Sequence, residues 1–152
     1  MTMHMEIIDL IPNSMSFRVI NTHDIHDHGT IPPHFTGRVR HWTAGTLVYV
    51  AWYQEGLLHN PGRSHPAYRR LRPTGELKYE RWYHHGRLED PAAGLPAVRG
   101  YYVDGSTHYE EHYLGGYRHD ASDGTPAIVK WRQDGTVRHR LRYRHGIRST
   151  DA

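Results

Sequence analysis

The sequence repeats itself with a period of 30 residues, and this period limits the folds open to the chain more than any other feature. The positions that agree at this offset are small, aromatic or turn-forming: Pro66-Ala67, Pro96-Ala97 and Pro126-Ala127; Gly45, Gly75, Gly105 and Gly135; Tyr53, Tyr83, Tyr113 and Tyr143; Gly56, Gly86, Gly116 and Gly146. A gap-free period indicates a tandem array in which each unit buries its apolar face against its neighbours. We therefore divide the chain into a segment 1–35 and four units, 36–65, 66–95, 96–125 and 126–152, which together form one structural domain.

Each unit is predicted to be a β-hairpin. Pro-Ala opens a first strand, and Asp104-Gly105 or Asp134-Gly135 then predicts a two-residue type I′ turn, because both central residues of that turn need positive φ. On the second strand, alternation places the Leu77 column and the Tyr79 column on one face, which we expect to be buried. No part of the repeats has a sustained helical period. The predicted fold is all-β, an antiparallel meander of tandem hairpins in an open twisted sheet.

The segment 1–35 is expected to cap this array. It contains two candidate strands, Met5–Leu10 and Met15–Asn21, followed by the polar run Thr22–Gly29. The end units of a repeat array must be atypical because they cover an edge that would otherwise be exposed.

Composition excludes several classes of protein. The chain has no cysteine, which rules out disulfides, thiolate zinc sites and cysteine nucleophiles. No stretch approaches the ~18 apolar residues of a membrane span, and no signal peptide is recognisable, so we expect a cytoplasmic protein. The net charge of +3 is too small to indicate nucleic-acid binding by itself, although 15 histidines make the charge sensitive to mild acid.

The stretch from His119 to Thr136 resembles a known family. With Asp123-Gly124-Thr125-Pro126-Ala127 followed by Asp134-Gly135, it is similar to tandem repeats of large DNA viruses, phages and bacteria that read H-R-x-D-G-P-A-x-I-x-Y-x-x-D-G-x and then Y-x-x-G. These repeats look like longer relatives of the MORN repeat. The similarity covers about residues 36–148 and is strongest over 94–146, whereas the first unit has Thr36-Gly37 in place of Pro-Ala. The resemblance implies a sheet used as a binding platform without catalytic residues, and related bacterial proteins are sometimes labelled antitoxins or immunity proteins.

Four arginines of the last unit alternate with other residues and are the first candidate binding site: Arg138, Arg140, Arg142 and Arg144. On one continuous strand, all four side chains would leave the same face as a positive stripe about 20 Å long, at ~3.3 Å per residue. Such a stripe suits an acidic protein surface or phosphate. The alternative is cross-strand pairing of Arg140 and Arg142 with Glu110 and Glu111 of the acidic third unit.

A second candidate binding site is a repeat column on the face opposite the Tyr column. It holds Trp52, Trp82, His112 and Arg142. Exposed aromatic rings beside arginine would anchor a protein partner or stack bases. Alternatively, the loops between units cover this column.

The run Asn21–Gly29 is the candidate metal site, through His23, His26 and His28. It resembles the T-H-x-H-x-D-H signature of the metallo-β-lactamase fold. Two residues separate His23 from His26 where that signature has one, so the alternation that aims both rings at one metal is lost. The run could still hold Zn²⁺ or Ni²⁺ through neutral imidazoles, or it is a solvated loop. No other cofactor is expected.

Together these features predict a non-enzymatic protein-binding module, an inhibitor, anti-defence or immunity-type factor that occludes an acidic partner surface. An enzyme is not expected, because the recurring residues are Gly, Pro, Ala and Tyr, which are structural. One alternative is nucleic-acid binding through the basic fourth unit. Another is a histidine-rich metal-binding protein.

Overall fold

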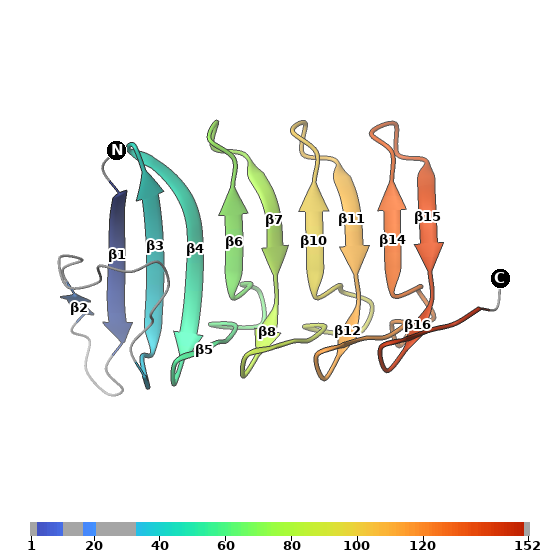
Figure 1. Ribbon diagram of the computed structural model, residues 1–152, viewed down its shortest axis with the longest axis horizontal. Coiled ribbons are helices and arrows are strands. Elements are labelled where there is room, and N and C mark those ends of the chain that lie inside the picture. The colour runs from blue at the N-terminus through green and yellow to red at the C-terminus, as the bar shows by residue number, and fades with distance from the viewer. Residues whose placement is uncertain (1–2, 11–16, 21–32, 151–152) are drawn as a thin grey trace.

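The protein is all-β and is built around one long antiparallel sheet. The computed structural model describes residues 3–10, 17–20 and 33–150, and these residues contain strands but no helix. The sheet has 11 strands in the order β15-β14-β11-β10-β7-β6-β4-β3-β1-β2, with β5 paired to β4 (Figure 1). Its strands are β1 (Met3–Leu10), β2 (Phe17–Ile20), β3 (Gly37–Thr43), β4 (Thr46–Gln54), β5 (Leu57–Leu58), β6 (Tyr68–Leu71), β7 (Leu77–Arg81), β10 (Val98–Tyr101), β11 (Thr107–Glu111), β14 (Ile128–Trp131) and β15 (Val137–Leu141). The predicted fold class, an open meander of hairpins, is confirmed.

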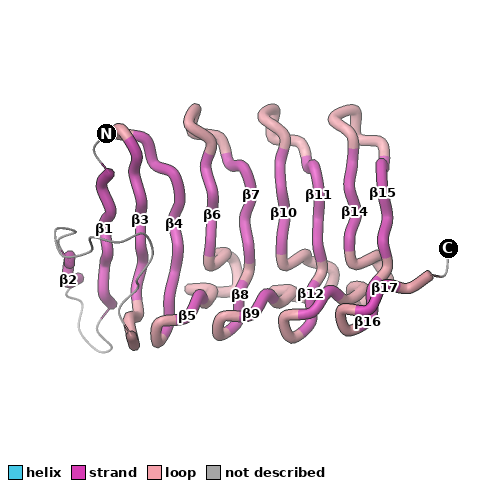
Figure 2. Tube along the Cα trace, in the orientation of Figure 1, coloured by secondary structure: helices cyan, strands magenta, loops and turns pink. Residues whose placement is uncertain are grey.

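The last three units each add a second, shorter hairpin at one end of the long strands. These hairpins join β8 (Tyr83–His84) to β9 (Arg87–Leu88), β12 (Tyr113–Leu114) to β13 (Tyr117–Arg118), and β16 (Tyr143–Arg144) to β17 (Ile147–Arg148). Figure 2 shows them in a row along one edge of the single layer of long strands. The unit is therefore two hairpins at different heights, where the sequence analysis predicted one.

In the last three units the two kinds of hairpin use different turns, and the type I′ turn predicted at Asp104-Gly105 and Asp134-Gly135 is not formed. Both central residues have positive φ in the short hairpins, as in His85-Gly86 at +45° and +80°, and also in the first long hairpin, at Ala44-Gly45 with +49° and +79°. At Asp104-Gly105 only the glycine has positive φ, at +85°. There the Asp104 carboxylate accepts a hydrogen bond from the backbone N–H of Ser106 at 2.9 Å, which holds a longer loop.

A β-bulge in each long hairpin changes which residues share a face. In the second unit the register shifts between Arg70 and Leu71, so that Arg70 lies opposite Tyr79 while Leu71 lies opposite Leu77. The extra residue reverses the alternation, and the Leu77 column faces away from the Tyr79 column. The predicted common face of these two columns is therefore wrong.

The core is thin and consists mostly of small side chains. Val39, Ala51, Ala67, Ala97 and Ala127 have no exposed surface. The larger rings on the predicted buried face, such as those of Tyr49 and Tyr79, are only half-buried. Within the described ranges the long strands form one layer, and the only other sheets are the three two-stranded short hairpins along its edge.

The N-terminal segment extends the sheet beyond the first unit, as the two candidate strands predicted. β1 pairs with β3, and β2 pairs with the other edge of β1. No helix in the described part of the chain is long and apolar enough to span a membrane.

Candidate functional site

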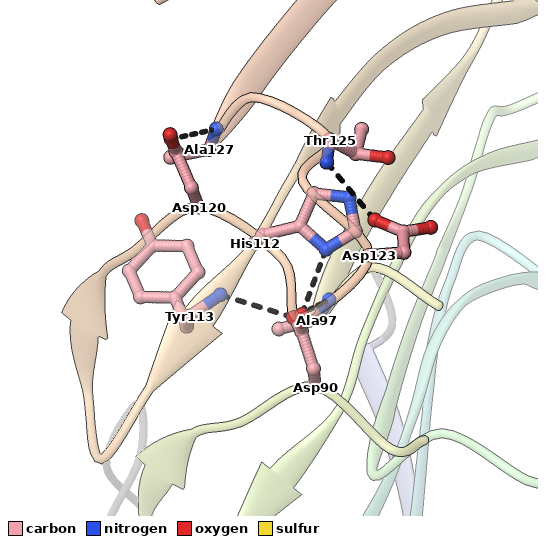
Figure 3. A network of polar contacts seen from close by, with 8 residues as sticks. All are labelled: Asp90, Ala97, His112, Tyr113, Asp120, Asp123, Thr125 and Ala127. Carbon is pink, nitrogen blue, oxygen red and sulfur yellow. Dashed lines mark hydrogen bonds and ion pairs between the residues drawn. The ribbon is translucent and has the colours of Figure 1, made fainter. Parts of the chain in front are cut away.

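Neighbouring units are joined by an Asp or Asn side chain between the short hairpins. Figure 3 shows Asp90 at the junction of the second and third units. Its Oδ1 accepts hydrogen bonds from the backbone N–H groups of Ala97 (2.9 Å) and Tyr113 (3.0 Å). Its Oδ2 lies 2.7 Å from Nδ1 of His112. One carboxylate therefore ties the start of one long strand to the short hairpin of the same unit.

The same contact recurs at the other two junctions. Asn60 Oδ1 accepts from Ala67 and Tyr83 at 3.0 and 2.9 Å, and Asp120 Oδ1 accepts from Ala127 and Tyr143 at 2.8 and 3.0 Å. The 30-residue spacing of Asn60, Asp90 and Asp120 is visible in the sequence, but the role of this column was not predicted from it. The choice between Asn and Asp follows the neighbouring column residue, which is Trp82 beside Asn60, His112 beside Asp90 and Arg142 beside Asp120. Aspartate is present at the two junctions where the second carboxylate oxygen, Oδ2, lies within hydrogen-bonding distance of a side-chain nitrogen.

His112 was predicted as a binding residue, and the structure places it inside the protein. Its side chain is 1% exposed, between Asp90 and the loop that carries Asp123 and Thr125 (Figure 3). Its Nε2 has no hydrogen-bond partner among the described residues. A ring covered in this way does not reach a partner or a substrate in solvent. The His112–Asp90 pair is a contact between units.

The two tryptophans of the same column are partly covered. Trp52 lines a small hollow with Pro66 and His65 of the following loop, and Nε1 of Trp82 is buried without a hydrogen-bond partner in the described part of the chain. Both side chains are half-buried. The loops between units therefore cover much of this column, which was one of the two interpretations.

The four arginines predicted to form one stripe do not lie on a single continuous strand. β15 ends at Leu141, a bulge lies near its start, and Arg144 belongs to the separate β16–β17 hairpin. Arg142 is paired with the Asp120 carboxylate at 2.8 Å. Arg138, Arg140 and Arg144 are exposed.

The predicted partners of these arginines are also different. Arg140 lies opposite Val129 in the register, and Glu110 and Glu111 pair with other arginines, Arg99 at 2.7 Å and Arg118 at 3.2 Å. Glu110 and Glu111 are therefore already neutralised by arginines of their own unit.

The predicted metal site at His23, His26 and His28 lies outside the described residues. Within them, three other histidines come together: His59, His84 and His85.

The most extended feature of the surface is a row of half-buried rings on one face of the long sheet. We call this the tyrosine face and define it by Tyr49, Tyr68, Tyr79 and Tyr109, with Arg70, Arg81 and Lys130 between them. Successive rings stack on one another, with centroids 5.4 Å apart for Tyr49 and Tyr68 and 5.9 Å for Tyr68 and Tyr79. Their planes differ by only 23° and 19°. The rings therefore present their edges to solvent.

Cations lie between these rings. The Arg81 guanidinium lies 4.7 Å from the centroid of the Tyr79 ring, a cation–π contact. Burial raises the pKa of the hydroxyls of Tyr49, Tyr68 and Tyr109, which keeps them neutral hydrogen-bonding groups.

The row of rings is interrupted at Gly100, whose place the Tyr109 ring fills. A hollow of about 290 Å³ lies on this face, lined by Arg81, Val98, Tyr109, Glu111, Tyr113 and Lys130 among others.

On the opposite face of the sheet, two arginines are paired with glutamates. There, Arg69 pairs with Glu80 at 3.4 Å and Arg99 pairs with Glu110 at 2.7 Å. On the tyrosine face, by contrast, Arg70 and Lys130 make no ion pair with any described residue. The tyrosine face therefore carries positive charge at Arg70 and Lys130 that no carboxylate of the described residues neutralises. On the opposite face, the exposed Arg140, which lies opposite Val129 in the Glu110 register, also makes no ion pair with a described residue.

Comparison with known proteins gives no relative: no protein-family model, no curated protein and no solved structure matches this chain. The function must be argued from the geometry of the chain itself.

Proposed function

We propose that the protein is a non-enzymatic protein-binding module that holds an acidic partner on its tyrosine face. The observation that carries this proposal is the stacked row of half-buried tyrosines beside Arg70 and Lys130, which make no ion pair with a described residue. Tyr and Arg are the residues most enriched at the energetic centres of protein interfaces. A tandem array with an extended open face is also the usual architecture of a binding platform.

The stacking of the rings favours a protein partner over single-stranded nucleic acid. Base recognition on such platforms uses the flat faces of aromatic rings. In the row Tyr49, Tyr68 and Tyr79, these faces are occupied by the neighbouring ring. The exposed edges and hydroxyls suit hydrogen bonding and edge contacts with a polypeptide.

The finer parts of the proposal follow from the repeat. The resemblance to MORN-like viral and bacterial repeats agrees with a platform that works by covering a partner surface, as an inhibitor, anti-defence or immunity-type factor in the cytoplasm would. The exposed Arg138, Arg140 and Arg144 are then a further basic region at the end of the array, with Arg140 on the face opposite the tyrosines. Nucleic-acid binding through this region is the competing outcome of the test below.

Two neighbouring arginines on β6 provide the experiment. Arg69 and Arg70 lie on opposite faces of the sheet, so Arg69→Ala and Arg70→Ala remove the same charge from the two faces. Tagged wild-type and variant proteins are incubated with nuclease-treated extract of the source cell, and recovered proteins are identified by mass spectrometry. We expect a protein that is recovered with the wild type and with Arg69→Ala but lost with Arg70→Ala. A central interface arginine contributes about 2 kcal/mol or more, which corresponds to roughly 30-fold weaker binding.

The competing results are distinct. Proteins recovered equally with both variants would remove the tyrosine face from the proposal. If no protein is recovered and the purified chain instead binds added nucleic acid, with an affinity that falls steeply with salt concentration, the chain belongs to the nucleic-acid class.

A further inference from the structure

Three imidazole rings lie against one another at the junction of the first and second units. His59 follows β5, while His84 and His85 belong to the β8–β9 hairpin. One nitrogen of each ring lies within 4.8 Å of the other two. The ring centroids are 5.1 Å apart for His59 and His84, 4.5 Å for His59 and His85, and 4.4 Å for His84 and His85. Among the described residues, no other three His, Asp or Glu side chains meet in this way.

The repeat shows that this cluster belongs to one junction only. The positions 30 residues further on hold Glu89, Leu114 and Gly115. The positions 60 residues further on hold His119, Arg144 and His145, and the rings of His119 and His145 again lie 4.5 Å apart. The same backbone therefore presents three imidazoles at the first junction, none at the second and two at the third, where arginine replaces the remaining ring.

Three imidazoles have the chemistry of a transition-metal site. Neutral imidazole nitrogen is a preferred ligand of Zn²⁺, Ni²⁺ and Cu²⁺, and three histidines with water in the fourth position form one type of zinc site. Metal binding requires neutral rings. His84 and His85 are exposed, so their side chains are free to turn toward a common ion.

One hydrogen bond competes with the metal. The backbone N–H of His85 donates to Nδ1 of His59 at 3.0 Å, and His145 makes the same contact with His119 at 3.1 Å. Because the third junction has this contact without a third ring, it belongs to the general geometry of the repeat. A coordinate bond at Nδ1 of His59 would replace it, and the released N–H lies on an exposed turn where water satisfies it.

We propose that His59, His84 and His85 bind one divalent transition-metal ion of the Zn²⁺ class, and that this ion joins the first unit to the second. His59 belongs to the first unit, and the other two ligands belong to the second. The three histidines come together only in the folded state. An ion bound to all three therefore stabilises that state. The site is separate from the tyrosine face, so metal binding and partner binding are measured independently.

The variant His84→Arg tests the proposal, because it gives the first junction the residues that the third junction already has. Calorimetric titration of the full chain with Zn²⁺ at neutral pH measures stoichiometry and affinity, and thermal melting in the same buffer measures stabilisation. We expect the wild type to bind one more equivalent than His84→Arg, or to bind it at least tenfold more tightly, since even outer-shell partners of a metal are worth 10–100-fold, to order of magnitude. The rise in melting temperature with Zn²⁺ should be lost in the variant.

The converse change builds the site where it is absent. Arg144→His completes a set of three histidines with His119 and His145, so it should gain one equivalent of Zn²⁺. A variant with alanine at His23, His26 and His28 controls for metal bound by that segment and should keep the equivalent that His84→Arg loses. Equal zinc binding by wild type and His84→Arg would overturn the proposal, as would an Arg144→His variant that binds no more zinc than the wild type.

Discussion

Replacing Asp90 by alanine should strongly destabilise the junction between the second and third units. Its carboxylate accepts three hydrogen bonds, from the backbone N–H groups of Ala97 and Tyr113 and from the His112 ring. Ala97 has no exposed surface and His112 is 1% exposed, so water does not readily replace the lost acceptor. Each buried donor left without a partner costs about 1–3 kcal/mol. Because the Asp90 side chain itself is one-fifth exposed, the lower end of this range applies, and we expect a loss of ~3 kcal/mol.

Asp90→Asn is the matched control. The amide keeps an oxygen for the two backbone donors, as Asn60 does at the first junction, and loses only the charged contact with His112. We therefore expect it to cost ~1 kcal/mol. Urea denaturation followed by far-ultraviolet circular dichroism and by tryptophan fluorescence gives both free energies of unfolding. If the alanine and asparagine variants differ by less than about 1 kcal/mol, the backbone donors find other acceptors, and the role assigned to the Asp or Asn column is refuted.

Two further predictions concern the tyrosines. In Gly100→Ala the added Cβ would lie 2.1 Å from Cε1 of Tyr109, so the ring must move and stability should fall by about 1–3 kcal/mol in urea denaturation. Gly62→Ala, where a Cβ meets nothing within 4 Å, should be close to neutral, and equal effects of the two changes would contradict the proposed packing. Burial together with the Glu80 contact raises the pKa of Tyr101 from 10.0 to about 12. Since the folded state then keeps a proton that the unfolded state has lost, stability should fall as pH rises from 10 to 12. Ultraviolet absorbance of tyrosinate checks this prediction, and Tyr101→Phe should reduce the pH dependence, whereas normal titration of every tyrosine near pH 10 would contradict it.

The sequence was sufficient to predict the period, the hairpins and the open sheet, because these depend on spacing and alternation. It did not predict the turn types, since Asp-Gly is compatible both with a two-residue turn and with a longer loop that has glycine in the left-handed conformation. Strands of two residues, such as Tyr83–His84, are too short to produce a pattern of their own. This is why the second hairpin of each unit was missed.

The candidate sites were harder to predict than the fold. The arginine stripe failed because a bulge and a strand end interrupt a pattern that looks continuous in sequence. The histidine cluster brings His59 together with His84, 25 positions further along the chain, so no short sequence motif indicates it. The column of Asn60, Asp90 and Asp120 had a visible signal in its spacing, but its role depends on backbone donors that only the folded chain brings together.

The order of strands has a consequence for how the molecule behaves in concentrated solution. Among the strands of the described residues, β15 is paired on one side only, with β14, so its other edge presents backbone groups that no described strand pairs. Edges of this kind promote association between molecules unless charge prevents it. Arg138 and Arg140 are exposed on this strand, so two copies that approach edge to edge bring like charges together. The same repulsion weakens as salt shortens the Debye length, which makes high ionic strength the condition under which this sheet would grow from one molecule into the next.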